Sequence, residues 1–181
     1  MRFNQLPDVD TLRRILDYNP ETGELTWKVR PRDLFSKEGE FKRWNGRHAG
    51  MPALNSINSG GYRTGTIFKV NYVAHRVCWK IHTGNEPPEI LDHINGDRTF
   101  NAFHNLREAT FVQNVGNRFP NRDTSSKYRG ASWCSRDRFW ASYCAGVWLG
   151  RFQTEEEAAL AYNAYAIKHY GEFAKLNRIG E

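Results

Sequence analysis

The spacing of apolar residues along the chain changes between a helical and a strand-like period, and these changes predict a series of short elements. Leu12, Ile15 and Leu16 recur at helical spacing, and either Asp8 or Asp10 can cap that helix. Other stretches place β-branched and aromatic residues between turn residues, which is typical of strands. The elements expected in the first half are a helix within 7–18, strands within 24–29 and 62–73, a long polar loop at 31–50 and a helix at 74–82.

The second half of the chain divides at residues 118–126, a polar stretch with a proline and two serines that is typical of a linker. Three β-rich runs follow, and Thr154 to Glu157 then forms a capping box for a helix with a face of small residues. Such a face can pack closely on a sheet. The pattern predicts an α+β protein with a region at 1–117 and a second domain at 127–181, a small three-stranded antiparallel sheet packed on one helix.

Charge adds a candidate partner to this picture. The net charge is +6, and residues 41–85 contain basic side chains but no Asp or Glu. A second basic stretch holds Lys127, Arg129, Arg136, Arg138 and Arg151 around a single acid, Asp137. Aromatic residues are interleaved through both stretches, a combination that favours nucleic-acid binding. An ordinary solvated basic face is the alternative.

Cysteine content and hydropathy exclude other classes. The three cysteines are widely spaced, so neither a disulfide framework nor a Cys-x-x-Cys zinc site is expected. No apolar run approaches the ~20 residues that span a bilayer, and no signal-peptide pattern opens the chain. We therefore expect a cytoplasmic protein without a membrane partner. A phage-encoded protein that acts inside the host cell would also fit this expectation. The sequence leaves the question of protein partners open.

The densest cluster of reactive side chains lies in residues 90–117. Asp92 and His93 lie between apolar residues, a turn follows them, and a returning strand leads to a short helix, capped by Thr110, that carries Asn114. A hairpin followed by a helix is expected to bring Asp92, His93 and Asn114 together. Phosphodiester hydrolysis needs a base with a pKa near neutral, for which His is the usual choice, and a cation that balances charge on the phosphate. Asp and Asn oxygens suit Mg²⁺, with Mn²⁺ as an alternative.

These residues resemble the HNH, or ββα-metal, nuclease motif. The resemblance rests on Asp-His-x-Asn-Gly (92–96), Asn-Leu-Arg (105–107) and the later Asn114, and it extends upstream to Tyr-x-Ala-His-Arg (72–76), Thr-Gly-x-x-Pro (83–87) and Asn-Pro-Glu-Thr-Gly-Glu-Leu-Thr-Trp (19–27). The form with Asn in the last position is typical of free-standing homing endonucleases.

The resemblance implies a role for each matching residue. His93 would be the general base, Asp92 and Asn114 the metal ligands, and Asn105 the residue that fixes the hairpin and orients His93. Arg76 and Arg107 would either grip phosphates or pair with acids. The histidine at position 75 and the residues Asp97 and Asn101 are expected to be structural.

Residues 127–177 resemble a second family, the DNA-binding domain of plant ethylene-response factors. The matching segments are Lys-Tyr-Arg-Gly (127–130), Phe-Trp-Ala (139–141), Trp-Leu-Gly-Arg-Phe (148–152), Thr-Glu-Glu-Glu-Ala-Ala-x-Ala-Tyr (154–162) and Gly-Glu-Phe-Ala-Lys-Leu-Asn (171–177). The resemblance implies that Arg129 and Trp148 face DNA. Positions that carry Arg in the plant proteins hold Ser132, Cys134, Ala145 and Gly146, so the plant recognition site does not transfer. Arg136 and Arg138 are expected to supply substitute contacts.

Taken together, the sequence predicts a metal-dependent endonuclease that acts on double-stranded DNA and is anchored by its C-terminal domain. A non-catalytic, sequence-specific DNA-binding regulator built from the same parts is the first alternative. An RNA-directed nuclease is the second, although a sheet-type reader favours duplex DNA.

Overall fold

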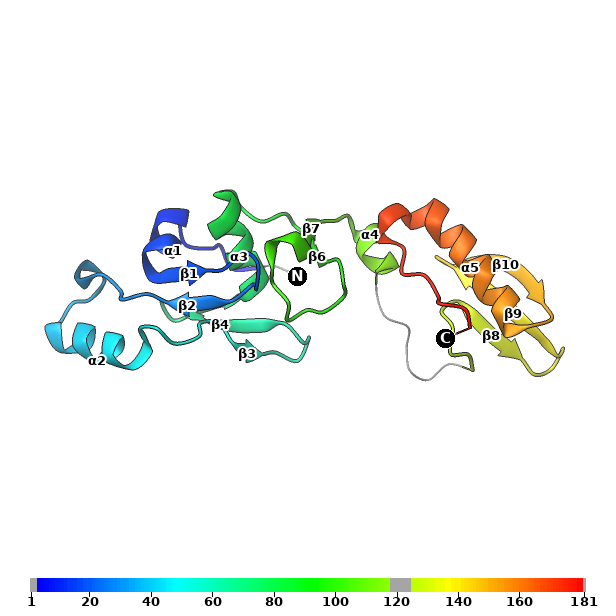
Figure 1. Cartoon of the computed structure of the whole chain (residues 1–181), viewed down its shortest axis with the longest axis horizontal. Coiled ribbons are helices and arrows are strands. Elements are labelled where there is room, and N and C mark those ends of the chain that lie inside the picture. Colours follow the sequence, from blue (N-terminus) through cyan, green and yellow to red (C-terminus); the bar gives the residue numbers. More distant parts are fainter. Residues whose placement is uncertain (1–2, 118–124, 181) are drawn as a thin grey trace. The chain divides into compact units, whose positions relative to one another are not determined.

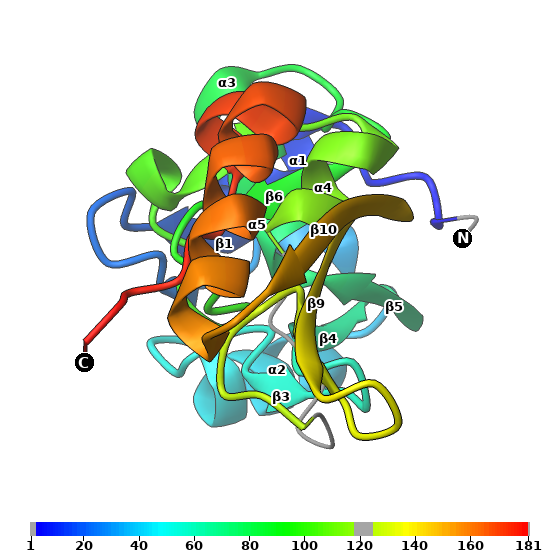
Figure 2. The same cartoon turned by 90° about the vertical axis from the view of Figure 1, so that its right-hand side faces the viewer.

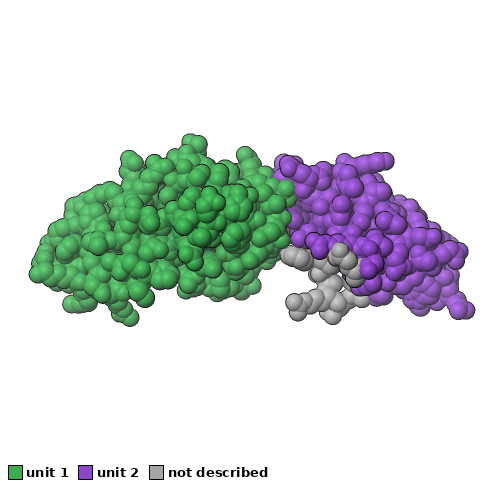
Figure 3. Space-filling model, viewed as in Figure 1, with its two compact units in different colours: residues 1–108 green, residues 109–181 purple. Residues whose placement is uncertain are grey.

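The computed structural model describes residues 3–117 and 125–180 of the chain, which forms two compact units, residues 1–108 and 109–181 (Figures 1 and 3). Both units combine helices with antiparallel sheets, so the predicted α+β class is confirmed. The division falls at 108/109 rather than after residue 117, because the short helix α4 packs on helix α5 of the second unit. Residues 118–124 of the expected linker lie outside the described residues.

The first unit consists of short elements. They are α1 (Val9–Ile15), β1 (Leu16–Tyr18), β2 (Leu25–Trp27), η1 (Arg32–Leu34), α2 (Glu38–His48), β3 (Ser56–Ile57), β4 (Arg63–Ile67), β5 (Val70–Val73), α3 (Ala74–Thr83), β6 (Leu91–His93), η2 (Phe103–Asn105) and β7 (Leu106–Glu108). Three antiparallel sheets result, β1-β2, β3-β4-β5 and β6-β7.

Helices α1 and α3 form the centre of this unit's core. Leu12, Ile15, Val77 and Cys78 are completely buried there, as the helical spacing predicts. Asp8 is the N-cap of α1, since its carboxylate accepts the Thr11 backbone N–H at 2.7 Å. The first helix ends earlier than residue 18 because Leu16 adopts an extended backbone and begins β1.

The prediction of a loop over residues 31–50 is wrong, because residues 38–48 form α2. This helix has no buried residue, so its apolar pattern is too weak to predict it. It is held instead by polar and aromatic contacts. The Asn45 amide bonds the backbone N–H and C=O of Arg30 at 2.8 and 3.0 Å, and the Trp44 ring packs edge-on against Trp27 at 5.4 Å.

The second unit contains α4 (Phe111–Gly116), β8 (Ala131–Cys134), β9 (Phe139–Cys144), β10 (Val147–Phe152), α5 (Glu155–Tyr170) and η3 (Gly171–Phe173). The sheet has the order β10-β9-β8 and is antiparallel, and α5 crosses one of its faces (Figure 2). The predicted capping box at Thr154 is present. Small residues bring the helix close to the sheet, since the Ser142 hydroxyl donates to the Ala158 carbonyl at 2.8 Å. This part of the fold was predicted correctly.

Within residues 3–117 and 125–180, no helix is both long and apolar enough to cross a membrane. The cysteines at 78, 134 and 144 are all free.

Candidate active site and DNA-binding face

The candidate active site begins with the hairpin of β6 and β7. Its register pairs Asp92 with Arg107 and His93 with Leu106. The Arg107 Nε donates to the Asp92 carboxylate at 3.0 Å, and both side chains are largely buried. Of the two roles expected for Arg107, the structure therefore supports pairing with an acid. Successive residues of a strand point to opposite faces, so Asp92 and His93 extend from the two faces of β6.

His93 is 3% exposed, and its Nε2 lies 3.0 Å from the Oδ1 atom of Asn101. An amide oxygen can only accept a hydrogen bond, so this contact keeps the proton of a neutral imidazole on Nε2. The basic lone pair then resides on Nδ1. Asn101 is itself 1% exposed, which holds this arrangement in a fixed position.

Two further rings surround His93. Tyr62 lies 6.0 Å from it between ring centroids, and His75 lies 5.1 Å away in an edge-on orientation. Burial lowers the pKa of His93 below its usual value, and the bond to Asn101 and the negative charges of Asp92 and Asp97 oppose that change. Burial, the nearby His93 and Arg76 lower the pKa of His75 even further. The site therefore favours neutral imidazoles, the form in which His93 can accept a proton.

Asn105 fixes the loop that links β6 to β7. Its Oδ1 accepts the backbone N–H of Asn95 at 3.0 Å, and its Nδ2 donates to the Phe100 carbonyl at 2.8 Å. The prediction that Asn105 fixes the hairpin agrees with these bonds. The direct contact with His93, however, is made by Asn101, which sequence reasoning had assigned to loop stabilisation.

The β1–β2 turn supports this loop from the other side. The Tyr18 hydroxyl donates to the Asn101 carbonyl at 2.9 Å, and the Phe103 N–H donates to the Pro20 carbonyl at 2.8 Å. Gly23 lies against the same segment at φ +76°, where a Cβ atom would come within 2.3 Å of the Asn101 and Ala102 backbone. The early Asn-Pro-Glu-Thr-Gly segment is thus part of the support of His93. The resemblance of this segment to the nuclease group indicated that it matters for the site. The sequence did not reveal that it contacts the Asn101 loop.

Asn114 lies on α4, in the second unit. Thr110 caps this helix as predicted, in a capping box with Gln113, and the end of the helix is held within its own unit. Gly116 lies against Tyr170, so closely that a Cβ atom would meet the ring at 2.5 Å. The approach of Asn114 to Asp92 stays a prediction. Among the described residues, no group of three His, Cys, Asp or Glu side chains could hold a metal ion.

The candidate DNA-binding face is the side of the C-terminal sheet opposite α5. Trp148 is 44% exposed there, beside Tyr143 at 4.9 Å and Phe139 at 6.2 Å between ring centroids. The Arg151 guanidinium lies over the Phe139 ring at 4.6 Å. The resemblance predicted Trp148 on this face, and the structure adds Tyr143 and Phe139 beside it. Trp140 packs against the unit's core.

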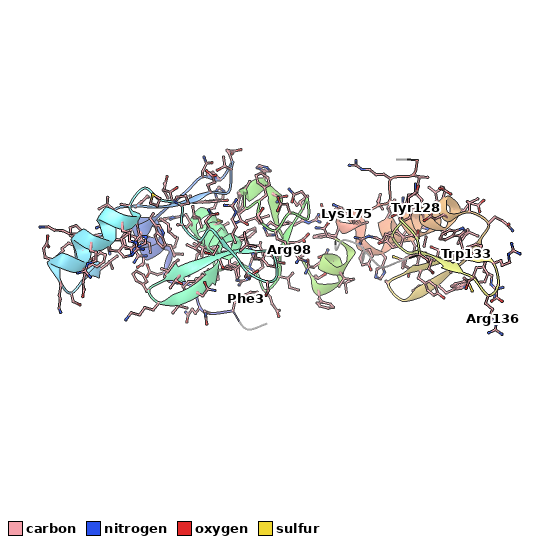
Figure 4. All side chains as sticks on the ribbon, turned by 90° about the horizontal axis from the view of Figure 1, so that it is seen from below. Phe3, Arg98, Tyr128, Trp133, Arg136 and Lys175 are labelled. Atoms are coloured by element: carbon pink, nitrogen blue, oxygen red, sulfur yellow. The ribbon has the colours of Figure 1, made fainter. Side chains whose placement is uncertain are left out.

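The predicted arginine contacts fall into two groups. Arg136 and Arg138 are exposed in the β8–β9 turn, and Figure 4 shows Arg136 at the outer end of that hairpin. Arg129 instead donates from Nη1 to the Gly116 carbonyl at 3.0 Å, which supports the end of α4. Arg76 donates to the carbonyls of Pro88 and Pro87 at 2.8 and 3.3 Å. Arg129 and Arg76 thus each donate to backbone carbonyls within their own unit, and their contact with DNA stays a prediction.

Comparison with known proteins gives a match over the part of the chain that contains the β6–β7 hairpin. Residues 72–115 match the family model of the HNH endonucleases. This stretch is similar to HNH endonucleases. An uncharacterized HNH endonuclease of Acanthamoeba polyphaga mimivirus is 37% identical over 110 residues, which cover 58% of this chain and 57% of that relative. The chain thus spans little more than half the length of that protein. No solved structure matches the chain.

Proposed function

We propose that the chain is a metal-dependent DNA endonuclease of the HNH type, free-standing and of the homing kind. One observation carries the proposal: inside the stretch that matches HNH endonucleases, the buried His93 is oriented by Asn101, and the preceding residue Asp92 is held by Arg107. A neutral, oriented imidazole can act as the general base in phosphodiester hydrolysis, and a fixed carboxylate can hold the cation that the reaction uses.

His93 would act as the general base. Its Nδ1 lone pair would take a proton from the attacking water, while the Nε2 proton would remain on its bond to Asn101. The resulting imidazolium would be stabilised by that bond and by the negative charges of Asp92 and Asp97, the same interactions that oppose the lowering of its pKa. Asn105 and the β1–β2 turn would hold the loop in place during the reaction.

Asp92 and Asn114 would hold the metal ion. One carboxylate and one amide oxygen fit a hard cation such as Mg²⁺, which keeps several waters and takes further oxygens from substrate phosphates. A bound Mg²⁺ or Mn²⁺ ion would balance negative charge on the phosphate and the leaving oxygen. Arg107 would keep the Asp92 carboxylate in position.

The C-terminal sheet would hold the enzyme on double-stranded DNA. Its exposed aromatic face with Arg151, and the exposed Arg136 and Arg138 of the neighbouring turn, combine stacking surface with positive charge. The likeness of this unit to the plant ethylene-response-factor domain supports the same role. Its target would differ from the plant site because the matching arginine positions hold other residues.

Incubation of supercoiled plasmid with the protein and Mg²⁺, with and without EDTA, tests the proposal. Nicked or linear DNA should form only when free metal is present. Full cleavage in excess EDTA would contradict the metal mechanism. Binding of DNA without cleavage under any divalent metal would instead favour the non-catalytic regulator.

A further inference from the structure

The first unit contains a second candidate site, away from the β6–β7 hairpin. A cavity of about 720 Å³ lies among β2, α2, β3, β4 and the β4–β5 turn. Its walls include the rings of Trp27, Trp44 and Phe68, and its polar lining consists of hydroxyl, amide, imidazole and cationic groups. A cavity of this size is within the range that binds small ligands. None of its lining residues is an Asp or a Glu.

Arg30 gives this cavity its charge. The residue is only 7% exposed, and its guanidinium lies 3.7 Å from the Trp44 ring centroid and 4.6 Å from that of Trp27. Within the part of the chain that the structure describes, the guanidinium has no acidic partner, and its buried Nε has no hydrogen-bond acceptor. Buried charges in proteins are normally paired and hydrogen-bonded. The aromatic rings compensate this charge only in part, and burial lowers the pKa of Arg30 to about 10.

The surroundings hold Arg30 in this position. Asn45 fixes its backbone from α2, so the side chain extends from a rigid base into the aromatic walls. Across the cavity, Phe68 and Lys69 both adopt positive φ, 49° and 68°, in the two-residue β4–β5 turn. Asn-Gly forms such turns at lower cost. The bulkier pair places Phe68 5.2 Å from the Arg30 guanidinium and the exposed Lys69 at the rim.

The cavity therefore contains a buried cation, Arg30, that has no acidic partner among the described residues, and it is also lined by a second cation, Lys69, and several hydroxyl groups. Such a site is suited to an anion. We propose that this cavity binds a phosphate group of a nucleic-acid strand, with Arg30 as its inner contact and Lys69 as its outer contact. The inference rests on the proposed DNA substrate, and it adds a point of attachment in the first unit that is distinct from the C-terminal sheet. Arg30 and guanidinium groups in general suit phosphate because their planar donors match its oxygens.

The test measures binding of the full chain to a short fluorescent DNA duplex in EDTA, where no cleavage interferes. Lys69→Ala and Arg30→Gln should each weaken binding roughly tenfold or more, the usual loss for a charged hydrogen bond. Each should also reduce the salt slope of binding by about 0.9. Arg43→Ala is the matched control, since Arg43 is exposed on α2 and does not line the cavity. Its effect should be less than twofold.

Thermal denaturation separates the remaining outcomes. Inorganic phosphate and a nucleoside monophosphate should raise the Tm of the wild type less than the duplex does, and Arg30→Gln should lose these increases. If free phosphate compounds stabilise the protein while the variants bind duplex normally, the cavity takes a soluble phosphate compound and the inference is overturned. If no phosphate compound changes the Tm and Lys69→Ala binds normally, Arg30 only packs between the rings, which also overturns it. Lys69 is exposed, so its variant remains informative even if Arg30→Gln does not fold.

Plasmid cleavage is measured separately. A protein that binds DNA through Arg30 and Lys69 but never cuts would retain this inference and lose the proposed function. If the wild type cuts DNA while both variants bind it normally, the proposed function is retained and this inference is lost.

Discussion

The β6–β7 hairpin and the outer face of the C-terminal sheet differ in how their functional side chains are held. In the hairpin, Asp92 and His93 are 6% and 3% exposed, and each is bonded to a neighbour. On the sheet, Trp148 and Tyr143 are 44% and 48% exposed and contact neighbouring rings. Buried, bonded groups are suited to chemistry that needs fixed geometry, whereas exposed rings and cations are suited to contact with a large partner.

Because of this difference, we expect substitutions in the two regions to impair different steps, cleavage in one and DNA binding in the other. Changes at the hairpin should reduce the rate of cleavage and leave affinity for DNA nearly unchanged. Changes on the sheet should reduce affinity and leave the rate at saturating protein nearly unchanged.

The largest effect is expected from His93→Ala. Loss of the general base should reduce the single-turnover cleavage rate by roughly 10²–10⁴. His104→Ala is the matched control because this histidine is exposed in the same loop, and it should cleave normally. A fully active His93→Ala enzyme would mean that another group is the base, and His75, 5.1 Å away, would be tested next.

Asn101 should give a smaller effect through the orientation of His93. Asn101→Ala removes the acceptor for Nε2 and should reduce the rate roughly 10- to 100-fold, as loss of an orienting partner usually does. Asn101→Asp keeps an acceptor and should recover most of the rate. Equal losses in both variants would show that Asn101 only fills space.

The β1–β2 turn should matter for stability as well as rate. In Gly23→Ala, the new Cβ atom would come within 2.3 Å of the Asn101 and Ala102 backbone, and the φ of +76° is itself strained. We expect a loss of about 2–3 kcal/mol in the free energy of unfolding, together with slower cleavage. Gly50→Ala is the control, since Gly50 has φ +80° and open space around it, so it should cost only about 1 kcal/mol. Similar Tm values for the two variants would contradict the contact.

The basic turn of the C-terminal unit should give the smallest effects. Arg136→Ala and Arg138→Ala should each reduce the salt slope of DNA binding by about 0.9 if each meets one phosphate. The exposed Lys168 on α5 is the control, because it belongs to the helix on the opposite side of the sheet. Unchanged slopes in both arginine variants would remove this turn from the DNA-binding face.

The sequence predicted those parts of the molecule whose signals are local. Local patterns a few residues long predicted the cap at Thr110 and the capping box at Thr154. They also predicted the core positions of α1 and α3 and the β-rich runs of the C-terminal sheet. Helix α2 was not predicted because it buries no residue. Hydrogen bonds of Asn45 and ring packing of Trp44 hold it in place instead.

Contacts between distant segments could not be predicted from the sequence. The link from Tyr18 and Gly23 to Asn101, and from there to His93, joins residues that are far apart along the chain. In the same way, the resemblance gives Arg129 the position of a DNA contact but does not reveal its hydrogen bond to the Gly116 carbonyl. Residue type and spacing cannot distinguish a guanidinium that meets DNA from one that satisfies a buried carbonyl.

The most direct test of this account measures two quantities on one DNA duplex, the affinity in EDTA and the single-turnover cleavage rate at saturating protein with Mg²⁺. The wild type is compared with His93→Ala and Trp148→Ala. We predict that His93→Ala keeps its affinity and loses its rate, and that Trp148→Ala loses affinity about tenfold, a typical value for a stacking side chain, and keeps its rate. A full cleavage rate in His93→Ala, or an unchanged affinity in Trp148→Ala, would contradict the account.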